Sequence, residues 1–122
     1  MAKRVLVVDD SATVRQQVAL ALGQVGFEVV EAVDGLDGLQ RISSTPQLAA
    51  VICDINMPRM NGLEMLEKVR ADARCAQLPI LMLTTEGQPA MMERAKKAGA
   101  KGWIIKPFKA DLLIAALRKL AA

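Results

Sequence analysis

The sequence predicts an α/β fold in which one parallel β-sheet lies between two layers of helices. Short apolar runs alternate with stretches of helical periodicity along all 122 residues. The run LAAVICDI, at residues 48–55, is apolar almost to its end, as a strand covered on both faces should be. Five strand–helix pairs follow one another without a linker or a repeat, so we expect a single domain over residues 1–122.

The first two pairs differ in how they end. RVLVV (4–8) is an apolar strand, and SATVRQQVALALGQVG (11–26) follows it as a helix that stops at its last glycine. FEVVEAV (27–33) is a β-rich run that leads into an Asp-Gly turn, and LDGLQRIS (36–43) is a brief amphipathic helix. The apolar residues at helical spacing are Val14, Val18, Leu22 and Val25 in the first helix and Leu36, Leu39 and Ile42 in the second.

Three further pairs complete the pattern. The expected strands are LAAVICDI (48–55), ILMLTT (80–85) and KGWIIKPF (101–108), and the expected helices are LEMLEKVRAD (63–72), QPAMMERAKKAG (88–99) and KADLLIAALRKLAA (109–122). In the first of these helices, Leu63, Leu66 and Val69 keep the spacing of a buried face. In the next, Pro89 suits the first turn and Gly99 suits the end.

The absence of histidine is the most decisive feature of the composition. It excludes Ser-His and Cys-His nucleophile pairs, histidine general bases and the usual zinc sites. The two cysteines, Cys53 and Cys75, stand in no metal-binding or redox spacing, and Cys53 lies inside an apolar run. Any chemistry must therefore use carboxylates, hydroxyls, lysines and hard metal ions.

Charge and hydropathy restrict the partners. The net charge is +3, and residues 94–122 hold eight basic side chains against one acid, Asp111. Only 2% of residues are aromatic and no basic run is interleaved with stacking groups, so we expect no nucleic-acid partner. The apolar runs are far shorter than a membrane span and the N-terminus resembles no export signal, so we expect a cytoplasmic protein without a membrane partner.

Polar residues stand at the ends of four of the five expected strands. Asp9 and Asp10 follow the first strand, Asp54 lies at the end of the third, Thr84 of the fourth and Lys106 of the fifth. The carboxyl ends of parallel strands share one edge of a sheet, and ligands bind there, at the point where the strand order reverses. If the first strand neighbours the third, three carboxylates converge at that edge.

Three carboxylates so close together are costly to ionise without a cation. Oxygen ligands without histidine favour a hard ion such as Mg²⁺ or Mn²⁺. The hydroxyl of Thr84 and the ammonium of Lys106 would complete a cradle for a transferred phosphoryl group, with Asp54 as the candidate nucleophile. Taken singly, these residues have simpler interpretations, because Asp9 and Asp10 can also cap the helix that follows them.

Four segments together resemble bacterial response-regulator receiver domains. They are VLVVDDS, VICDINMPRMNGLEML, PILMLTT and AGAKGWIIKPF, in the order and spacing of that family, and the resemblance runs from Lys3 to about Leu120. It implies a flavodoxin-like doubly wound three-layer sandwich, with five parallel strands in the order 2-1-3-4-5 and five helices. Within the family, the chain is similar to the stand-alone chemotaxis type (CheY-like).

The resemblance implies a role for each acid. Asp54 matches the phosphoacceptor, Asp10 matches a direct ligand of Mg²⁺ (or Mn²⁺), and Asp9 matches an acid that acts on the metal largely through water. Asn56 matches the position whose backbone carbonyl completes the metal shell. The side chain of Asn56 also occupies a position that, in the family, tunes the access of hydrolytic water.

Other residues match the parts of the family that sense the phosphoryl group. Thr84 and Lys106 match the hydroxyl and the ammonium that contact it, and Lys106-Pro107 matches a cis peptide bond. Trp103 occupies the position of the switch aromatic, which is usually Tyr or Phe, and a static core or interface tryptophan is the alternative. Glu86, two residues after Thr84, matches a second position that tunes hydrolytic water.

The resemblance therefore implies a phosphorylation-dependent signalling switch of a two-component system. Such a protein is not an enzyme with a substrate of its own, although it assists its own phosphorylation and dephosphorylation. A histidine kinase would be the phosphodonor. A downstream protein with an acidic or amphipathic segment would bind the face of the fourth helix, fifth strand and fifth helix. The basic residues of that region include Arg94, Lys96, Lys97, Lys101 and Lys109.

Other functions stay open at this point. The chain can also be the receiver domain of a larger regulator, a phosphorelay intermediate, an aspartyl-phosphate hydrolase, or a flavin or dinucleotide carrier. Hydrolases of the haloacid-dehalogenase type use a second acid two residues after the nucleophile, where this chain has Asn56. Carriers on this fold need a phosphate-binding loop after the first strand, and no Gly-rich segment follows Asp10.

Overall fold

The computed structural model of the protein describes residues 3–84 and 89–121. Within these ranges, one parallel sheet has the strand order β2-β1-β3-β4-β5, which is the order that the resemblance implies. Its strands are β1 (Arg4–Val8), β2 (Glu28–Ala32), β3 (Leu48–Asp54), β4 (Ile80–Thr84) and β5 (Gly102–Ile105). The order reverses between β1 and β3, so a ligand site is expected where these two neighbouring strands end.

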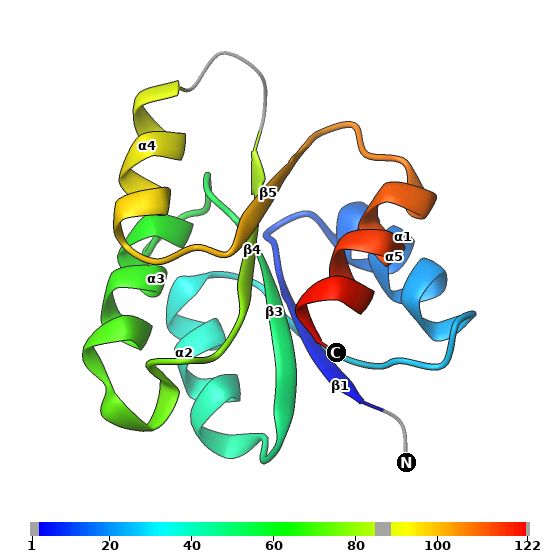
Figure 1. Cartoon of the computed structure of the whole chain (residues 1–122), viewed down its shortest axis with the longest axis horizontal. Helices are drawn as coiled ribbons and strands as arrows, with labels where there is room; N and C mark the ends of the chain where they lie inside the picture. Colours follow the sequence, from blue (N-terminus) through cyan, green and yellow to red (C-terminus); the bar gives the residue numbers. More distant parts are fainter. Residues whose placement is uncertain (1–2, 85–88, 122) are drawn as a thin grey trace.

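The helices form a layer on each face of this sheet. They are α1 (Ala12–Gly23), α2 (Gly35–Ser44), α3 (Gly62–Ala71), α4 (Pro89–Lys97) and α5 (Ala110–Leu120). Helices α1 and α5 cover one face, and α2, α3 and α4 cover the other (Figure 1). A single turn of 3-10 helix, η1 (Ala73–Cys75), follows α3 and is absent from the sequence prediction. None of the described helices is long and apolar enough to span a lipid bilayer.

The side chains of the central strands build two apolar cores. In β1, Val5 and Val7 pack in the core beneath α1 and α5, whereas Leu6 and Val8 pack in the core beneath α2 and α3. All four are fully buried. Each burial stabilises the fold by about 1.5–3 kcal/mol. Because successive side chains of a strand point to opposite faces, a sheet with helices on both sides needs strands that are apolar throughout.

The strand register brings the polar strand ends together. Val8 of β1 pairs with Cys53 of β3, so Asp9 and Asp54 come one residue further along two adjacent strands. Asp54 in turn pairs with Leu83 of β4, one residue before the end of that strand. We call this edge of the sheet, where the strands end, the carboxyl edge.

Helix α2 differs from the prediction. Leu36 is 46% exposed instead of facing the core, and the buried residues of the helix are Gly35 and Gly38. A Cβ atom at Gly35 would lie 2.7 Å from Cγ of Met60, and one at Gly38 would lie 2.7 Å from the sulfur of Met65. The two glycines thus allow α2 to pack closely on these methionines, and Leu36 is left on the outer side.

Helix α1 also ends earlier than the apolar spacing indicates. Its last residue is Gly23, and the chain then turns through Gly26, whose φ of 93° lies in the left-handed region that favours glycine. The backbone N–H of Phe27 donates to the carbonyl of Leu22 at 3.0 Å, which closes the turn into β2. The sequence therefore marks the turn correctly but not the last helical residue.

The two ends of the described chain meet at the edge of the sheet opposite to the carboxyl edge. Lys3, just before β1, donates a hydrogen bond from its ammonium to the backbone carbonyl of Ala121, just after α5. The two ends of the described chain accordingly lie at the same end of the molecule (Figure 1). The first strand and the last helix are thus joined away from the polar strand ends.

We expect Gly62→Ala to lower the free energy of unfolding by at least about 2 kcal/mol. A Cβ atom at Gly62 would lie 2.1 Å from the carbonyl oxygen of Asp54, and this backbone cannot yield without moving the end of β3. Gly23→Ala is the control, because a Cβ atom at Gly23 would have no heavy atom within 4 Å. It should be neutral or stabilise the protein by up to about 1 kcal/mol. Urea unfolding measures both, and equal effects would contradict the expectation.

Candidate functional site

Three carboxylates meet at the carboxyl edge. Ligand oxygens of Asp9, Asp10 and Asp54 all lie within 4.8 Å of one another. Asp9 is fully buried and Asp54 is 5% exposed, whereas Asp10 is exposed to solvent. The structure therefore brings together the three acids that the sequence places at the ends of its first and third strands.

Lys106 partly offsets this negative charge. Its Nζ lies 2.9 Å from Oδ2 of Asp9 and 3.2 Å from Oδ1 of Asp54. The lysine directly follows β5, and its bond to Pro107 is cis, as the resemblance implies. Three carboxylates and one ammonium carry a net charge of −3 + 1 = −2. A divalent cation would neutralise that charge.

The acids and the lysine shift one another's pKa values. Burial raises the pKa of Asp54, and the charge of Asp9 raises it further, although Lys106 opposes both effects. Burial alone would lower the pKa of Lys106, but the hydrogen bond to Asp9 and the charge of Asp54 outweigh it and raise the pKa. Lys106 is therefore a permanent cation near neutral pH, and Asp54 is a carboxylate that is poorly stabilised by its surroundings.

Asp9 is held by a hydrogen bond from the backbone, and it does not cap the helix that follows. Its Oδ1 accepts a hydrogen bond from the backbone N–H of Ser11 at 2.8 Å. The residue that caps α1 is Ser11, whose hydroxyl accepts from the backbone N–H of Val14. The helix-capping interpretation of Asp9 and Asp10 is therefore wrong.

Arg15 supports the same turn and was not predicted as a site residue. Its guanidinium donates to the carbonyl oxygen of Asp9 at 2.6 Å and to the carboxylate of Glu31 at 3.0 Å. The backbone N–H of Asp9 also donates to the carbonyl of Ala32. A basic residue one turn into the helix after an acidic pair is the only sequence signal that points to this contact.

Asn56 lies in the loop that follows Asp54. It is exposed, and a hydrogen bond from its backbone lowers the pKa of Asp54, against the stronger effect of burial. The loop returns to β3 where the N–H of Gly62 donates to the carbonyl of Ile55 at 2.9 Å. Asn61 then begins α3 with a capping box, in which its side chain and that of Glu64 each accept from the other's backbone N–H.

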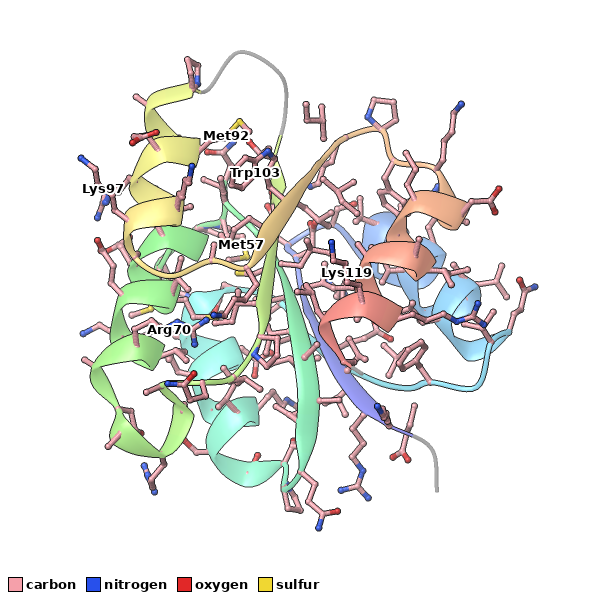
Figure 2. All side chains as sticks on the ribbon, in the orientation of Figure 1. Met57, Arg70, Met92, Lys97, Trp103 and Lys119 are labelled. Atoms are coloured by element: carbon pink, nitrogen blue, oxygen red, sulfur yellow. The ribbon has the colours of Figure 1, made fainter. Side chains whose placement is uncertain are left out.

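The remaining predicted positions lie on β4 and β5. Thr84, the last residue of β4, is fully buried and pairs with Ile105. Trp103 pairs with Met82 and is 39% exposed, so it is not a core residue. Figure 2 shows Trp103 beside β5 on the side toward α4. Glu86 lies outside the described residues, so its position stays a prediction.

The donor atoms at this edge fit a hard divalent cation. All three side chains offer carboxylate oxygens, and the role of the Asn56 backbone carbonyl in the metal shell stays a prediction. Mg²⁺ and Mn²⁺ prefer such oxygen ligands and are commonly held by one or two carboxylates, with waters completing the shell. When bound, such an ion would neutralise negative charge that develops on a transferred phosphoryl group.

Comparison with known proteins agrees with this geometry. Residues 5–118 match the response regulator receiver domain family. The chain belongs to this family. It is 41% identical to the chemotaxis protein CheY1 of Helicobacter pylori over 111 residues, which cover 90% of each chain. It is 40% identical to a CheY homolog of Campylobacter jejuni, covering 90% of this chain and 85% of the relative.

Solved structures show the same relationship. The chemotaxis protein CheY4 of Vibrio cholerae superimposes with a TM-score of 0.91 at 38% identity, covering 98% of this chain and 99% of the other. A CheY-like receiver domain protein of Methanospirillum hungatei superimposes with a TM-score of 0.91 at 26% identity, covering 99% and 94%. As a receiver domain, the protein is a phosphoacceptor signalling switch of the two-component type.

We expect Asp54→Asn to stabilise the metal-free protein at pH 7. The unfolded chain loses the Asp54 proton near the ordinary pKa of 3.8, whereas the folded chain keeps it to a higher pH. The folded state thus binds more protons in that interval, and ionised Asp54 destabilises it increasingly as the pH rises through the interval.

Urea unfolding in the presence of EDTA, at several pH values between about 4 and 8, measures this effect. The advantage of the variant should grow with pH and level off above the folded-state pKa. A variant that is less stable than wild type at pH 7 would mean that the lost contact with Lys106 outweighs burial and repulsion.

Proposed function

We propose that Asp54 is the residue that accepts the phosphoryl group, from a phosphohistidine of a partner kinase. The observation that carries this proposal is the contact of Lys106 with both Asp9 and Asp54 in a cluster that keeps a charge of −2. A structural ion pair would balance its charges, whereas this cluster keeps two negative charges, which one divalent cation would balance. We assign Asp10, Asp54 and the backbone carbonyl of Asn56 as metal ligands, with Asp9 acting through water.

The chemistry follows from the positions of these groups. An oxygen of Asp54 attacks the phosphorus in line, the bond from phosphorus to the histidine nitrogen breaks, and an acyl phosphate forms on the protein. Lys106 stabilises the negative charge of the phosphoryl oxygens, because its ammonium already lies beside Asp54. Hydrolysis of the acyl phosphate returns the carboxylate and releases inorganic phosphate.

Thr84 and Trp103 are proposed to couple this step to the surface. Thr84 ends the strand beside β5, and Trp103 lies on β5 two residues before the partner of Thr84, Ile105. A hydroxyl that moves toward the phosphoryl group would vacate space next to β5. Trp103, now 39% exposed, can then occupy a more buried position, which shifts an equilibrium between two conformations.

The face formed by α4, β5 and α5 is the proposed binding surface for a downstream protein. It exposes the apolar side chains of Trp103, Ile105 and Leu112 together with basic residues. The charge of Arg94 is partly offset there, because its guanidinium contacts both carboxylate oxygens of Glu67 on α3. The exposed lysines of this region are Lys96, Lys97, Lys101 and Lys109, and Figure 2 shows Lys97 extending away from the fold. This combination suits an acidic amphipathic segment.

We further propose that residues 1–122 form one receiver domain that acts in the cytoplasm. The family match covers residues 5–118, and the two apolar cores extend over both halves of the chain. The hydrolase alternative lacks support in the site, because the residue two positions after Asp54 is Asn56, which cannot act as a general acid.

Incubation with acetyl phosphate and Mg²⁺ should add one phosphoryl group to the protein, as measured by intact mass. Asp54→Asn and Asp10→Asn should each abolish the adduct, the first by removing the nucleophile and the second by removing a metal ligand. Asp37→Asn, which changes an acid of α2 outside the carboxylate cluster, is the control and should be phosphorylated normally. An adduct that persists in Asp54→Asn, or in the presence of a chelator, would contradict the proposal.

Beryllofluoride, a stable mimic of the phosphoryl group, should shift the emission of Trp103 to shorter wavelength when Mg²⁺ is present. Trp103 is the only tryptophan, so the signal reports this position alone. Thr84→Ala should lose most of the shift, because the coupling hydroxyl is gone. Binding without any change of emission in the wild type would show a static tryptophan and remove Trp103 from the switch.

A further inference from the structure

Asp34 is a buried carboxylate outside the phosphoacceptor cluster. Among the described residues, four polar side chains are buried, and three of them, Asp9, Asp54 and Thr84, belong to the candidate site. The fourth is Asp34, which lies between β2 and α2 and is 2% exposed. A buried carboxylate is costly unless it is paired and hydrogen-bonded, so its partners show what it does.

The two oxygens of Asp34 have different partners. Oδ1 accepts from the backbone N–H of Asp37 at 2.9 Å and so caps α2. Oδ2 accepts from Nε of Arg59 at 2.6 Å and from a terminal nitrogen of the same guanidinium. The hydrogen bond from Asp37 and the contact with Arg59 lower the pKa of Asp34, so the carboxylate is ionised near neutral pH. Capping explains one oxygen, and Arg59 explains the other.

Arg59 belongs to the loop that carries Asn56. Its φ is 63°, in the left-handed region, and it sits at the centre of a tight turn in which the N–H of Met60 donates to the carbonyl of Pro58 at 2.7 Å. The carbonyl of Met60 in turn accepts from the N–H of Gly35 at 3.0 Å. We call the Asp34–Arg59 ion pair and the Gly35–Met60 hydrogen bond together the loop clamp.

The loop clamp fixes one end of a very short span. At the other end, Asp54 is held in the sheet, and the N–H of Ile55 donates to the carbonyl of Leu83 at 3.1 Å. Only Asn56, Met57 and Pro58 lie between these two attachments. The position of the turn at Arg59 therefore restricts the backbone conformations that these three residues can adopt, including the direction of the Asn56 carbonyl.

We propose that the loop clamp orients the backbone carbonyl of Asn56 for the divalent cation, which makes Asp34 and Arg59 positioning residues of the metal site. This inference rests on the proposed function, because it takes Asn56 as a ligand. Partners that orient metal ligands contribute about 10- to 100-fold to metal affinity in other proteins. We expect an effect at the lower end, because one ligand among several is oriented.

A purely electrostatic effect of Asp34 and Arg59 on metal affinity predicts a different result from the loop clamp. The two explanations differ in whether the Arg59 substitution strengthens or weakens metal binding. Removal of the positive charge of Arg59 near a cation site would strengthen metal binding, and removal of the negative charge of Asp34 would weaken it. Loss of the clamp weakens binding in both cases. Arg59→Asn and Asp34→Asn are suitable changes, since Asn tolerates the left-handed φ at position 59 and remains a good helix cap at position 34.

The test measures the dissociation constant of Mn²⁺ from the loss of the electron paramagnetic resonance signal of the free ion. The clamp predicts about tenfold weaker binding for Arg59→Asn and for Asp34→Asn, and no further loss in the double variant. Arg59→Lys should recover part of the affinity, because an ammonium can still contact Asp34. Gln47→Asn is the matched control. Among the described residues other than glycine, only Gln47 and Arg59 have a positive φ, which is 59° at Gln47. This variant should bind Mn²⁺ as wild type does.

Each outcome has one meaning once far-UV circular dichroism shows that the variants are folded. Tighter binding in Arg59→Asn with weaker binding in Asp34→Asn would replace the clamp by simple electrostatics. Unchanged binding in both variants would leave Asp34 and Arg59 with a structural role only and overturn the inference, while the proposed function stands. Failure of the wild type itself to bind Mn²⁺ would overturn the metal site, and the inference with it.

Discussion

Asp9, Asp10 and Asp54 place three negative charges where their oxygen atoms lie no more than 4.8 Å apart. Nothing in the local sequence of either strand would hold such a group together, because like charges repel. It is held by the parallel pairing of β1 with β3, whose buried side chains on both faces supply the stabilisation. The helices on both sides bury the side chains of these strands, and Gly62 allows α3 to begin close to the end of β3. The fold thus holds three negative charges together. Lys106 offsets one of them, and a divalent cation would balance the other two.

The parts of the site that follow from strand ends could be predicted from the sequence. Asp54 and Lys106 are distant along the chain, yet Asp54 ends β3 and Lys106 directly follows β5, and parallel strands end at one edge. The strand order itself came from the resemblance to receiver domains, because alternation of strands and helices does not say which strands are neighbours. Once β1 and β3 are known to be adjacent, the meeting of Asp9 with Asp54 follows directly.

Contacts that depend on how helices and loops pack could not be predicted in this way. Leu36 keeps the spacing of a core residue. However, Gly35 and Gly38 of the same helix pack closely against the methionines beneath it, so Leu36 is left exposed. The ion pair of Asp34 with Arg59 joins a helix cap to a loop, and no pattern in the sequence links them. An arginine also gives no sign that its φ will be positive, as a glycine would.

The contact of Lys3 with the carbonyl of Ala121 has a practical consequence for any polypeptide joined to this protein. Both ends of the described chain leave the fold beside each other, on the side away from the acids (Figure 1). A fused module, an affinity tag or a surface linkage at either end would therefore start from the same place, and a short one would not reach the carboxylates. The ends of the described chain and the carboxylate cluster thus lie at opposite ends of the strands.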